Sequence, residues 1–353
     1  MRSIGHNRGV NTYDASPVEA LRRIAFLLER SRAETYKVKA FRAAAAIILP
    51  IDPDEIAERV RTDRLRELDG IGASTAEVIA SVVRGEMPAR LARLEDEVGG
   101  PLVEGGTTLR AALRGDLHSH SDWSDGGSPI EEMAFTAMQL GHDYQVLTDH
   151  SPRLRVANGL SVERLRKQLV IVDAINDHLA GDFRLLKGIE VDILDDGSLD
   201  QTEDMLAQLD LRVASVHSKL AMDRDDMTAR MVAAVANPFT NVLGHCTGRL
   251  VTGSRGVRGQ SQFDARAVFE ACAEHSVAVE INARPERRDP PSKLIELALE
   301  IGCLFAIDSD AHAPGQLDFQ IYGCARAEEL GVPAERIVNT WELDRLLEWA
   351  NGG

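Results

Sequence analysis

The chain has 353 residues, of which 44% are hydrophobic and 27% are charged, and its formal net charge is −16. This composition is typical of a soluble globular protein with room for two domains. The negative charge argues against broad, non-specific binding of nucleic acid, because such binding depends on cations that neutralise phosphates. No apolar run reaches the roughly eighteen residues of a membrane helix, so we expect no contact with a membrane.

The first stretch, residues 1–15, begins with MRSIGHNRGVN. It lacks the apolar core of a signal peptide, and we expect a disordered tail. The four cysteines lack CxxC spacing and indicate buried thiols in a reducing compartment. Both features favour a cytoplasmic location.

Residues 16–98 predict a small all-α domain. The segment SPVEALRRIAFLLERS opens with a serine and a proline, which is typical of an N-cap and a first helical position. YKVKAFRAAAAIIL and DPDEIAERV predict two more helices, and a glycine-rich turn, LDGIG, leads into a fourth. Residues 21–42 carry seven basic side chains against two acidic ones, which gives this acidic chain a local positive region.

The segment GGPLVEGGTT contains four glycines and a proline and predicts a linker over 99–112. From residue 113 to 353 the pattern changes to short apolar runs that alternate with helical stretches. The seven runs are RGDLHSHS, YQVLTDHS, FRLLKGIEVDIL, LRVASVHS, TNVLGHC, VAVEINARP and LFAIDSDAH. Strands that alternate with helices predict a parallel sheet, and closing that sheet gives a distorted, TIM-like (βα)7 barrel of the α/β class.

Six of the seven strand candidates end in histidine, aspartate or glutamate, where parallel α/β proteins place their active sites. Any one of these residues could be structural, and Asp125 or Asp310 could instead cap the following helix. Nine such groups at corresponding strand ends, however, indicate a metal centre with more than one ion. The nine are His118, His120, Asp125, His150, Glu190, His217, His245, Asp310 and His312.

The ligand types narrow the choice of metal. Imidazole mixed with carboxylate suits Mn²⁺, Zn²⁺ or Fe²⁺ better than Ca²⁺ or Mg²⁺. Nine ligands are too many for one ion, so we expect two to three divalent ions, Mn²⁺ and/or Zn²⁺, with Fe²⁺ as a further option. Such clusters activate water and stabilise a phosphoryl displacement, which predicts phosphoester hydrolysis.

Four segments resemble the motifs of the PHP (polymerase and histidinol phosphatase) superfamily: DLHSHSDWSDG, LTDHS, SVHS with LGHCTGR, and DSDAH. GIEVDILDDGSLD and EINARPERRDPP are similar to the PHP domain at the C-terminus of bacterial family X DNA polymerases. The resemblance implies three sets of metal ligands, and the four residues that bind the first ion are also the expected catalytic residues. These sets are His118, His120, Glu190 and Asp310 for one ion, Glu190, His217 and His245 for a second, and Asp125, His150 and His312 for a third.

Three basic residues just beyond strand-end motifs, Lys219, Arg249 and Arg284, could hold the substrate phosphate. The alternative is that they are ordinary surface charges.

YKVKAFRAAA and LDGIGASTAEVIASVVRGE resemble the helix-hairpin-helix domain that opens the family X polymerases. In such a domain, backbone N–H groups at a glycine turn meet a DNA phosphate. The resemblance thus implies a DNA-binding surface, for which the candidates are Gly70, Gly72, Lys37, Lys39 and Arg42. The alternative is a helical bundle used for dimerisation or for packing on the barrel.

Two departures from the polymerases limit this resemblance. The palm and fingers that lie between the two regions are missing, and Val78 stands where the lyase lysine of the polymerase beta version is expected. We therefore expect neither polymerase nor lyase activity.

Together these patterns predict a metal-dependent phosphoesterase that acts on DNA. The expected activity is that of a 3′–5′ exonuclease or a repair nuclease that processes 3′ ends, gaps or damaged sites. The first alternative is a small-molecule phosphomonoesterase of histidinol-phosphatase type, and a second is a non-catalytic DNA-binding scaffold, which the complete ligand set disfavours. The sequence leaves the oligomeric state open, with a monomer favoured.

Overall fold

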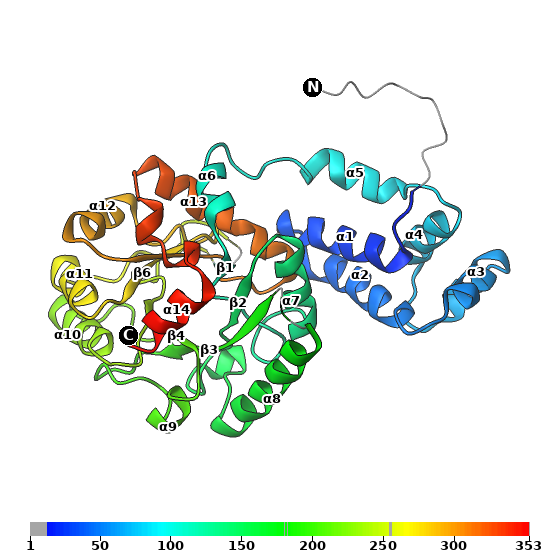
Figure 1. Ribbon diagram of the computed structural model, residues 1–353. Coiled ribbons are helices and arrows are strands. Elements are labelled where there is room, and N and C mark those ends of the chain that lie inside the picture. The colour runs from blue at the N-terminus through cyan, green and yellow to red at the C-terminus, as the bar shows by residue number, and fades with distance from the viewer. Residues whose placement is uncertain (1–12, 180, 182, 254–255, 353) are drawn as a thin grey trace. The chain divides into compact units, whose positions relative to one another are not determined.

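The computed structural model describes residues 13–179, 181, 183–253 and 256–352. Residues 1–12 of the predicted tail lie outside the described residues. The chain divides into two compact units, Met1–Pro101 and Leu102–Gly353. The first is helical, and the second combines strands with helices (Figure 1). Within the described ranges, no helix is both long enough and apolar enough to cross a membrane.

The described part of the helical unit contains the α-helices α1 (Pro17–Arg30), α2 (Thr35–Ile48), α3 (Pro53–Arg61), α4 (Ala73–Val83) and α5 (Ala89–Val98). α1 begins at the predicted serine and proline. The Ser16 hydroxyl accepts a hydrogen bond from the Glu19 backbone N–H, and the Glu19 carboxylate accepts one from the Ser16 N–H, so two donors at the helix start are satisfied. Apolar side chains of α1 pack against α2, α4 and α5 and form a core that belongs to this unit alone.

The glycine-rich turn lies between a short 3₁₀ helix, Leu65–Glu67, and α4. Gly70 has a φ of +87°, and a Cβ atom there would lie 2.6 Å from Cδ1 of Ile47, so the backbone requires glycine. Gly72 is the N-cap of α4, and its N–H donates to Oγ1 of Thr75 over 3.1 Å. The turn is therefore fixed by α2 on one side and by α4 on the other.

The second unit is built on a seven-stranded parallel sheet whose strands follow chain order. The strands are β1 (Gly115–Asp116), β2 (Tyr144–Leu147), β3 (Arg184–Asp192), β4 (Leu211–Ser215), β5 (Val242–Leu243), β6 (Ala278–Asn282) and β7 (Phe305–Asp308). Just beyond β1 and β7, Ser119 and Ala311 form a further parallel bridge, which brings the two edges of the sheet together. The predicted (βα)7 barrel is therefore confirmed.

Helices surround the strands (Figure 1). They are α7 (Ile130–Gln139), α8 (Val162–Leu179), α9 (Glu203–Leu206), α10 (Arg224–Val235), α11 (Ala265–Glu274), α12 (Ser292–Ile301), α13 (Gln320–Glu329) and α14 (Leu343–Ala350). The main apolar core lies between strands and helices. All four cysteines are free and buried, as their spacing predicts.

The structure differs from the predicted linker over 99–112. Its second half forms the helix α6 (Thr107–Ala112), which packs against α13. The Glu328 carboxylate accepts hydrogen bonds from the backbone N–H groups of Gly106 and Leu109, at 2.7 and 2.8 Å. A glycine-rich segment is thus held by a carboxylate more than two hundred residues away, a contact that local sequence cannot reveal. Only the first part of the segment connects the two units.

Candidate metal centre

The nine predicted ligands lie together at the C-terminal ends of the strands. The C-terminal part of β3 explains how a charged residue enters this region. Ile189 and Val191 are fully buried in the main apolar core, and Glu190 between them points to the opposite face of the strand because side chains alternate. The other eight follow β1 (His118, His120, Asp125), β2 (His150), β4 (His217), β5 (His245) and β7 (Asp310, His312).

Five imidazoles surround the carboxylate of Glu190, which is only 1% exposed. The distances from its oxygens are 2.7 Å to Nδ1 of His150, and 2.9, 3.2, 3.4 and 3.7 Å to Nε2 of His245, His217, His118 and His120. A carboxylate with two oxygens in this position can bridge two neighbouring ions.

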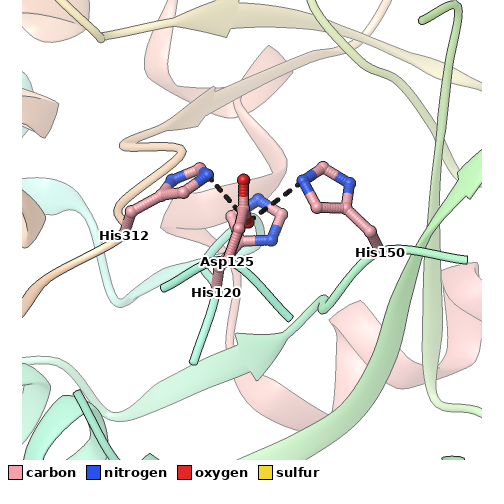
Figure 2. A group of neighbouring side chains, drawn as sticks. All are labelled: His120, Asp125, His150 and His312. Atoms are coloured by element: carbon pink, nitrogen blue, oxygen red, sulfur yellow. Dashed lines mark ion pairs between the residues drawn. The ribbon is translucent and has the colours of Figure 1, made fainter. Parts of the chain in front are cut away.

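Among the residues that the structure describes, three groups of ligand atoms lie close enough together to hold an ion each, with all atoms of a group within 4.8 Å of one another. In the group of Figure 2, Oδ1 of Asp125 lies 3.3 Å from Nε2 of His150 and 3.2 Å from Nε2 of His312, beside His120. The second group is His118, His120 and Asp310, and the third is His150, Glu190 and His217. His120 and His150 each belong to two groups, so the sites are contiguous.

Buried polar atoms without a hydrogen-bond partner are concentrated in this cluster. Among the described residues they include Nε2 of His118, both ring nitrogens of His120, Nδ1 of His150 and of His245, Nε2 of His217 and Oε2 of Glu190. Buried polar groups in folded proteins nearly always have partners. Imidazole nitrogens and carboxylate oxygens are ligands of Zn²⁺, Mn²⁺ and Fe²⁺, so the cluster suits several divalent ions.

Electrostatic interactions favour the ligating form of the carboxylates of Glu190 and Asp310 and of the imidazole of His120. Burial alone would raise the pKa of Glu190, but the surrounding imidazoles, His217 foremost, hold it well below its usual value. Burial would also raise the pKa of Asp310, and the guanidinium of Arg284 is the main cause that lowers it well below its usual value. Burial lowers the pKa of His120, which favours the neutral imidazole that binds metals.

Two carboxylates outside the predicted set contact the Nδ1 atoms of candidate histidine ligands and so orient their rings. Oε1 of Glu280 lies 2.6 Å from Nδ1 of His118, and Oδ1 of Asp192 lies 3.1 Å from Nδ1 of His217. Such partners fix the tautomer and leave Nε2 for an ion. Neither carboxylate is among the site residues predicted from the sequence. A glutamate inside the apolar run VAVEINA was nevertheless a signal, since a buried carboxylate needs a partner.

Of the three residues predicted to hold phosphate, the structure brings Arg284 to the cluster, where its Nη1 lies 3.1 Å from Nδ1 of His312. Lys219 instead pairs with Asp195 at 2.7 Å, and Arg249 donates to backbone carbonyls of the loop after β6. In the described part of the chain, neither side chain makes a hydrogen bond or ion pair to the nine ligands. The structure thus does not support direct phosphate binding by these two residues, because their loops turn them toward other partners.

Arg287, which is not among the predicted phosphate-binding residues, does reach the cluster. Its Nε donates to Oδ2 of Asp310 over 3.1 Å. Arg287 lies three residues after Arg284 in RPERRDP. Both side chains contact residues that follow β7. The clustering of arginines in that segment was the available signal.

The candidate DNA-binding residues of the helical unit fall into two classes. Gly70, Gly72, Lys37 and Lys39 are exposed. Arg42 instead donates to both carboxylate oxygens of the buried Glu29, at 2.9 and 2.7 Å. It therefore joins α2 to α1, and the structure gives it a structural role.

A parallel barrel with a histidine and carboxylate cluster at its C-terminal strand ends suits metal-assisted hydrolysis. Residues 116–284 match the PHP domain. The chain therefore carries a region that matches the PHP domain over just under half of its length.

Known relatives of this chain differ in their functions. A DNA polymerase/3′-5′ exonuclease of Bacillus subtilis is 37% identical over 231 residues, which are 65% of this chain but only 40% of that protein. A probable phosphatase of Caldanaerobacter subterraneus is 28% identical over 261 residues, which are 70% of this chain and 94% of that protein. A solved structure of histidinol phosphate phosphatase from Lactococcus lactis, with zinc, L-histidinol and phosphate, is 16% identical and has a TM-score of 0.45 over 62% of this chain and 92% of its own.

Proposed function

We propose that the protein is a 3′–5′ exonuclease or 3′-end-processing repair nuclease without polymerase activity. The main support is the 37% identity of 231 residues of the chain to the polymerase/exonuclease of B. subtilis, which exceeds the 28% identity to the probable phosphatase. A chain that also carries a helical unit with a helix-hairpin-helix-like turn fits a DNA substrate better than a small molecule. The proposed partners are DNA 3′ ends, gaps or damaged sites, and the proposed state is a monomer.

In this proposal the helical unit, residues 16–98, docks on DNA. Its exposed turn at Gly70 and Gly72, followed by the start of α4, offers backbone N–H groups to a phosphate. Lys37 and Lys39 on α2 would add positive charge to the same unit. Residues 113–353 would then cut the phosphodiester.

The barrel residues divide the work of hydrolysis among themselves. His118, His120, Glu190 and Asp310 would hold one ion, with His217 and His245 completing a second site and Asp125, His150 and His312 a third. Bound divalent ions would supply an activated water and neutralise charge on the phosphate. Glu280 and Asp192 hold imidazoles in their ligating orientation, while Arg284 and Arg287 face the region where phosphate oxygens would lie.

A second candidate is a phosphomonoesterase that acts on a small phosphorylated metabolite. The observation that favours it is the match to nearly the whole length of a probable phosphatase, 94% of that protein. Under this alternative the helical unit would serve packing or association rather than DNA binding.

The two candidates are separated by substrate. Purified protein supplied with Mn²⁺ is tested on a 5′-labelled duplex with a recessed 3′ end and, separately, on histidinol phosphate. Stepwise 3′ shortening, with no release of phosphate from histidinol phosphate, is the expected result. Asp310→Ala should abolish the shortening, whereas Asp344→Ala, at an exposed position on α14, should leave it intact.

Release of phosphate from histidinol phosphate without any shortening of DNA would overturn the proposal in favour of the phosphatase. A variant that lacks residues 1–98 should lose DNA affinity and keep activity on a small phosphodiester. Unchanged DNA affinity in that variant would reject the docking role of the helical unit.

A further inference from the structure

The loop after β6, residues 284–290, presents two arginines to the metal centre. Nη1 of Arg284 lies 3.1 Å from Nδ1 of His312, and Nε of Arg287 donates to Oδ2 of Asp310 over 3.1 Å. A guanidinium has five N–H donors, so the contact of Arg287 with Asp310 leaves others for a phosphate oxygen. The position of this loop therefore decides where positive charge meets the substrate.

The backbone carbonyls of the same loop are held from outside by arginines of other segments. Nε of Arg249, in the loop after β5, donates to the carbonyl of Arg287 over 3.2 Å, and its Nη2 donates to the carbonyl of Arg288. Arg326 of α13 donates to the carbonyl of Pro290. Two guanidinium groups thus bind the carbonyls of three of the loop's last four residues.

The loops after β5 and β6 are also joined through a buried carboxylate. Asp289 is fully buried and accepts hydrogen bonds from the N–H and Oγ1 of Thr247, at 3.2 and 2.8 Å, and from the N–H of Arg249 at 3.3 Å. Arg249 therefore contacts the arginine loop through both its backbone and its side chain. A conformational change at Arg249 cannot leave the loop unaffected.

The loop conformation itself requires such restraints. Arg288, between the Arg287 that reaches Asp310 and the buried Asp289, has a φ of +48°. A non-glycine residue in the left-handed region is strained and persists only when its surroundings hold it there. The carbonyl that Arg249 binds through Nη2 belongs to this strained residue.

We propose that Arg249 is a positioning residue for phosphate binding: it does not touch the substrate, but holds the 284–290 loop so that Arg287 faces Asp310 and the phosphate. This proposal rests on phosphoester hydrolysis alone and is independent of whether the substrate is DNA. It also accounts for an arginine that follows a strand-end motif and yet points away from the metal centre.

The test is a double-mutant cycle on the affinity for inorganic phosphate. Wild type, Arg249→Gln, Arg287→Gln and the double variant are reconstituted with Mn²⁺, and phosphate binding is measured by calorimetry. Each single variant should bind phosphate about tenfold more weakly, the scale of one hydrogen bond to a charged group. The double variant should bind no more weakly than Arg287→Gln alone, because both changes remove the same contact.

A matched control distinguishes positioning from general loosening of the β5 loop. Arg258 lies in that loop, and its Nε donates to the carbonyl of Gly248 over 2.7 Å, within the same loop. Arg258→Gln should leave phosphate affinity unchanged. With a small chromogenic phosphodiester, Arg249→Gln should raise KM more than it lowers kcat, and Arg249→Lys should recover part of the loss.

Three results would overturn the proposal. Additive losses in the cycle would mean that Arg249 binds phosphate directly. Unchanged phosphate affinity in a folded Arg249→Gln, or an equal loss in Arg258→Gln, would leave Arg249 with a purely structural role. If Arg249→Gln does not fold, the cycle is run with Arg249→Lys, for which an undiminished phosphate affinity counts against the proposal in the same way.

Discussion

The helical unit and the barrel use buried charge in opposite ways. Among the described residues of the helical unit, Glu29 is the one buried carboxylate, and Arg42 neutralises it with two hydrogen bonds. The described part of the barrel buries eight carboxylates: Asp116, Asp149, Glu190, Asp192, Glu280, Asp289, Asp308 and Asp310. Several of these face imidazoles rather than arginines.

The comparison distinguishes buried charges that stabilise the fold from buried charges that are placed to bind a ligand. A buried charge is costly unless it is paired. In the helical unit the pairing is complete within the chain. Around Glu190, by contrast, imidazole nitrogens remain without hydrogen-bond partners, so the barrel completes this region only with metal ions. Changes at the two kinds of site should therefore differ in what they damage.

The largest effect is expected at Glu190, because five imidazoles converge on it. Glu190→Ala should lose bound metal and lower phosphoesterase activity by more than the roughly hundredfold limit seen for residues behind the ligands. Metal content of the purified variant and hydrolysis of a small phosphodiester are the measurements. Glu296→Ala, at an exposed position of α12, serves as the control. Full metal content in Glu190→Ala would contradict the assignment of the cluster.

Arg42 should behave in the opposite way. Arg42→Ala removes the two hydrogen bonds that Arg42 donates to the buried carboxylate of Glu29. Breaking a buried ion pair typically costs about 3–5 kcal/mol, while metal content and small-substrate activity should stay at the wild-type level. Urea unfolding followed by helical circular dichroism measures the loss. The double change Arg42→Leu with Glu29→Leu should restore most of the stability, and failure to do so would mean that the pair is not the main interaction lost.

His142 tests whether a buried imidazole of the barrel outside the metal centre still affects stability. Burial is the main cause that lowers the pKa of His142 to about 3, whereas an unfolded chain has a pKa near 6.5. Unfolding thus takes up a proton at acidic pH, so stability is intact above pH 6.5 and is lost as the pH falls toward 3, by up to about 1.4 kcal/mol per unit.

The measurement is urea unfolding from pH 7 to pH 4. His142→Gln can still accept a hydrogen bond from Arg110, whose Nη2 lies 3.2 Å from Nε2 of His142, but it cannot take up a proton. The difference in stability between wild type and variant should therefore shrink as the pH falls. A constant difference would show that His142 does not titrate on unfolding.

The smallest effect is expected at the glycine turn of the helical unit. Gly70→Ala forces a side chain into a left-handed backbone and against Ile47, and should destabilise the unit by about 1–2 kcal/mol. Gly100→Ala is the control, since a Cβ atom there meets nothing within 4 Å and the residue has no positive φ. Equal effects of the two changes on the unfolding midpoint would contradict the strain at Gly70.

The barrel and the positions of its nine ligand candidates could be predicted because both depend on local order. Six of the seven short apolar runs ended in a ligating residue, and parallel topology brings those ends together. The sequence could not show which way a loop side chain turns. Arg249 and Arg287 both lie in loops that contain several arginines. The fold directs Arg287 toward the carboxylate of Asp310 and Arg249 toward backbone carbonyls.

Contacts between residues distant in the sequence also could not be predicted. Arg42 pairs with Glu29 thirteen residues earlier, and α6 is held by Glu328 from the far end of the chain. Neither partner can be chosen from composition or periodicity. Glu280 was within reach of sequence reasoning, because a carboxylate in the middle of a buried strand requires a partner and its neighbours in the barrel are histidines.

Asp310 is a candidate metal ligand, and its backbone adopts a conformation that glycine adopts more easily than aspartate. Its φ is +50°, a conformation that glycine adopts without strain. At this position, selection for a stable chain and selection for a working enzyme therefore favour different residues. A library screened only for thermal resistance should accumulate glycine at 310, whereas one screened for hydrolysis should keep aspartate. The residue found at this position in a newly sequenced relative would thus indicate which of the two pressures its lineage has experienced.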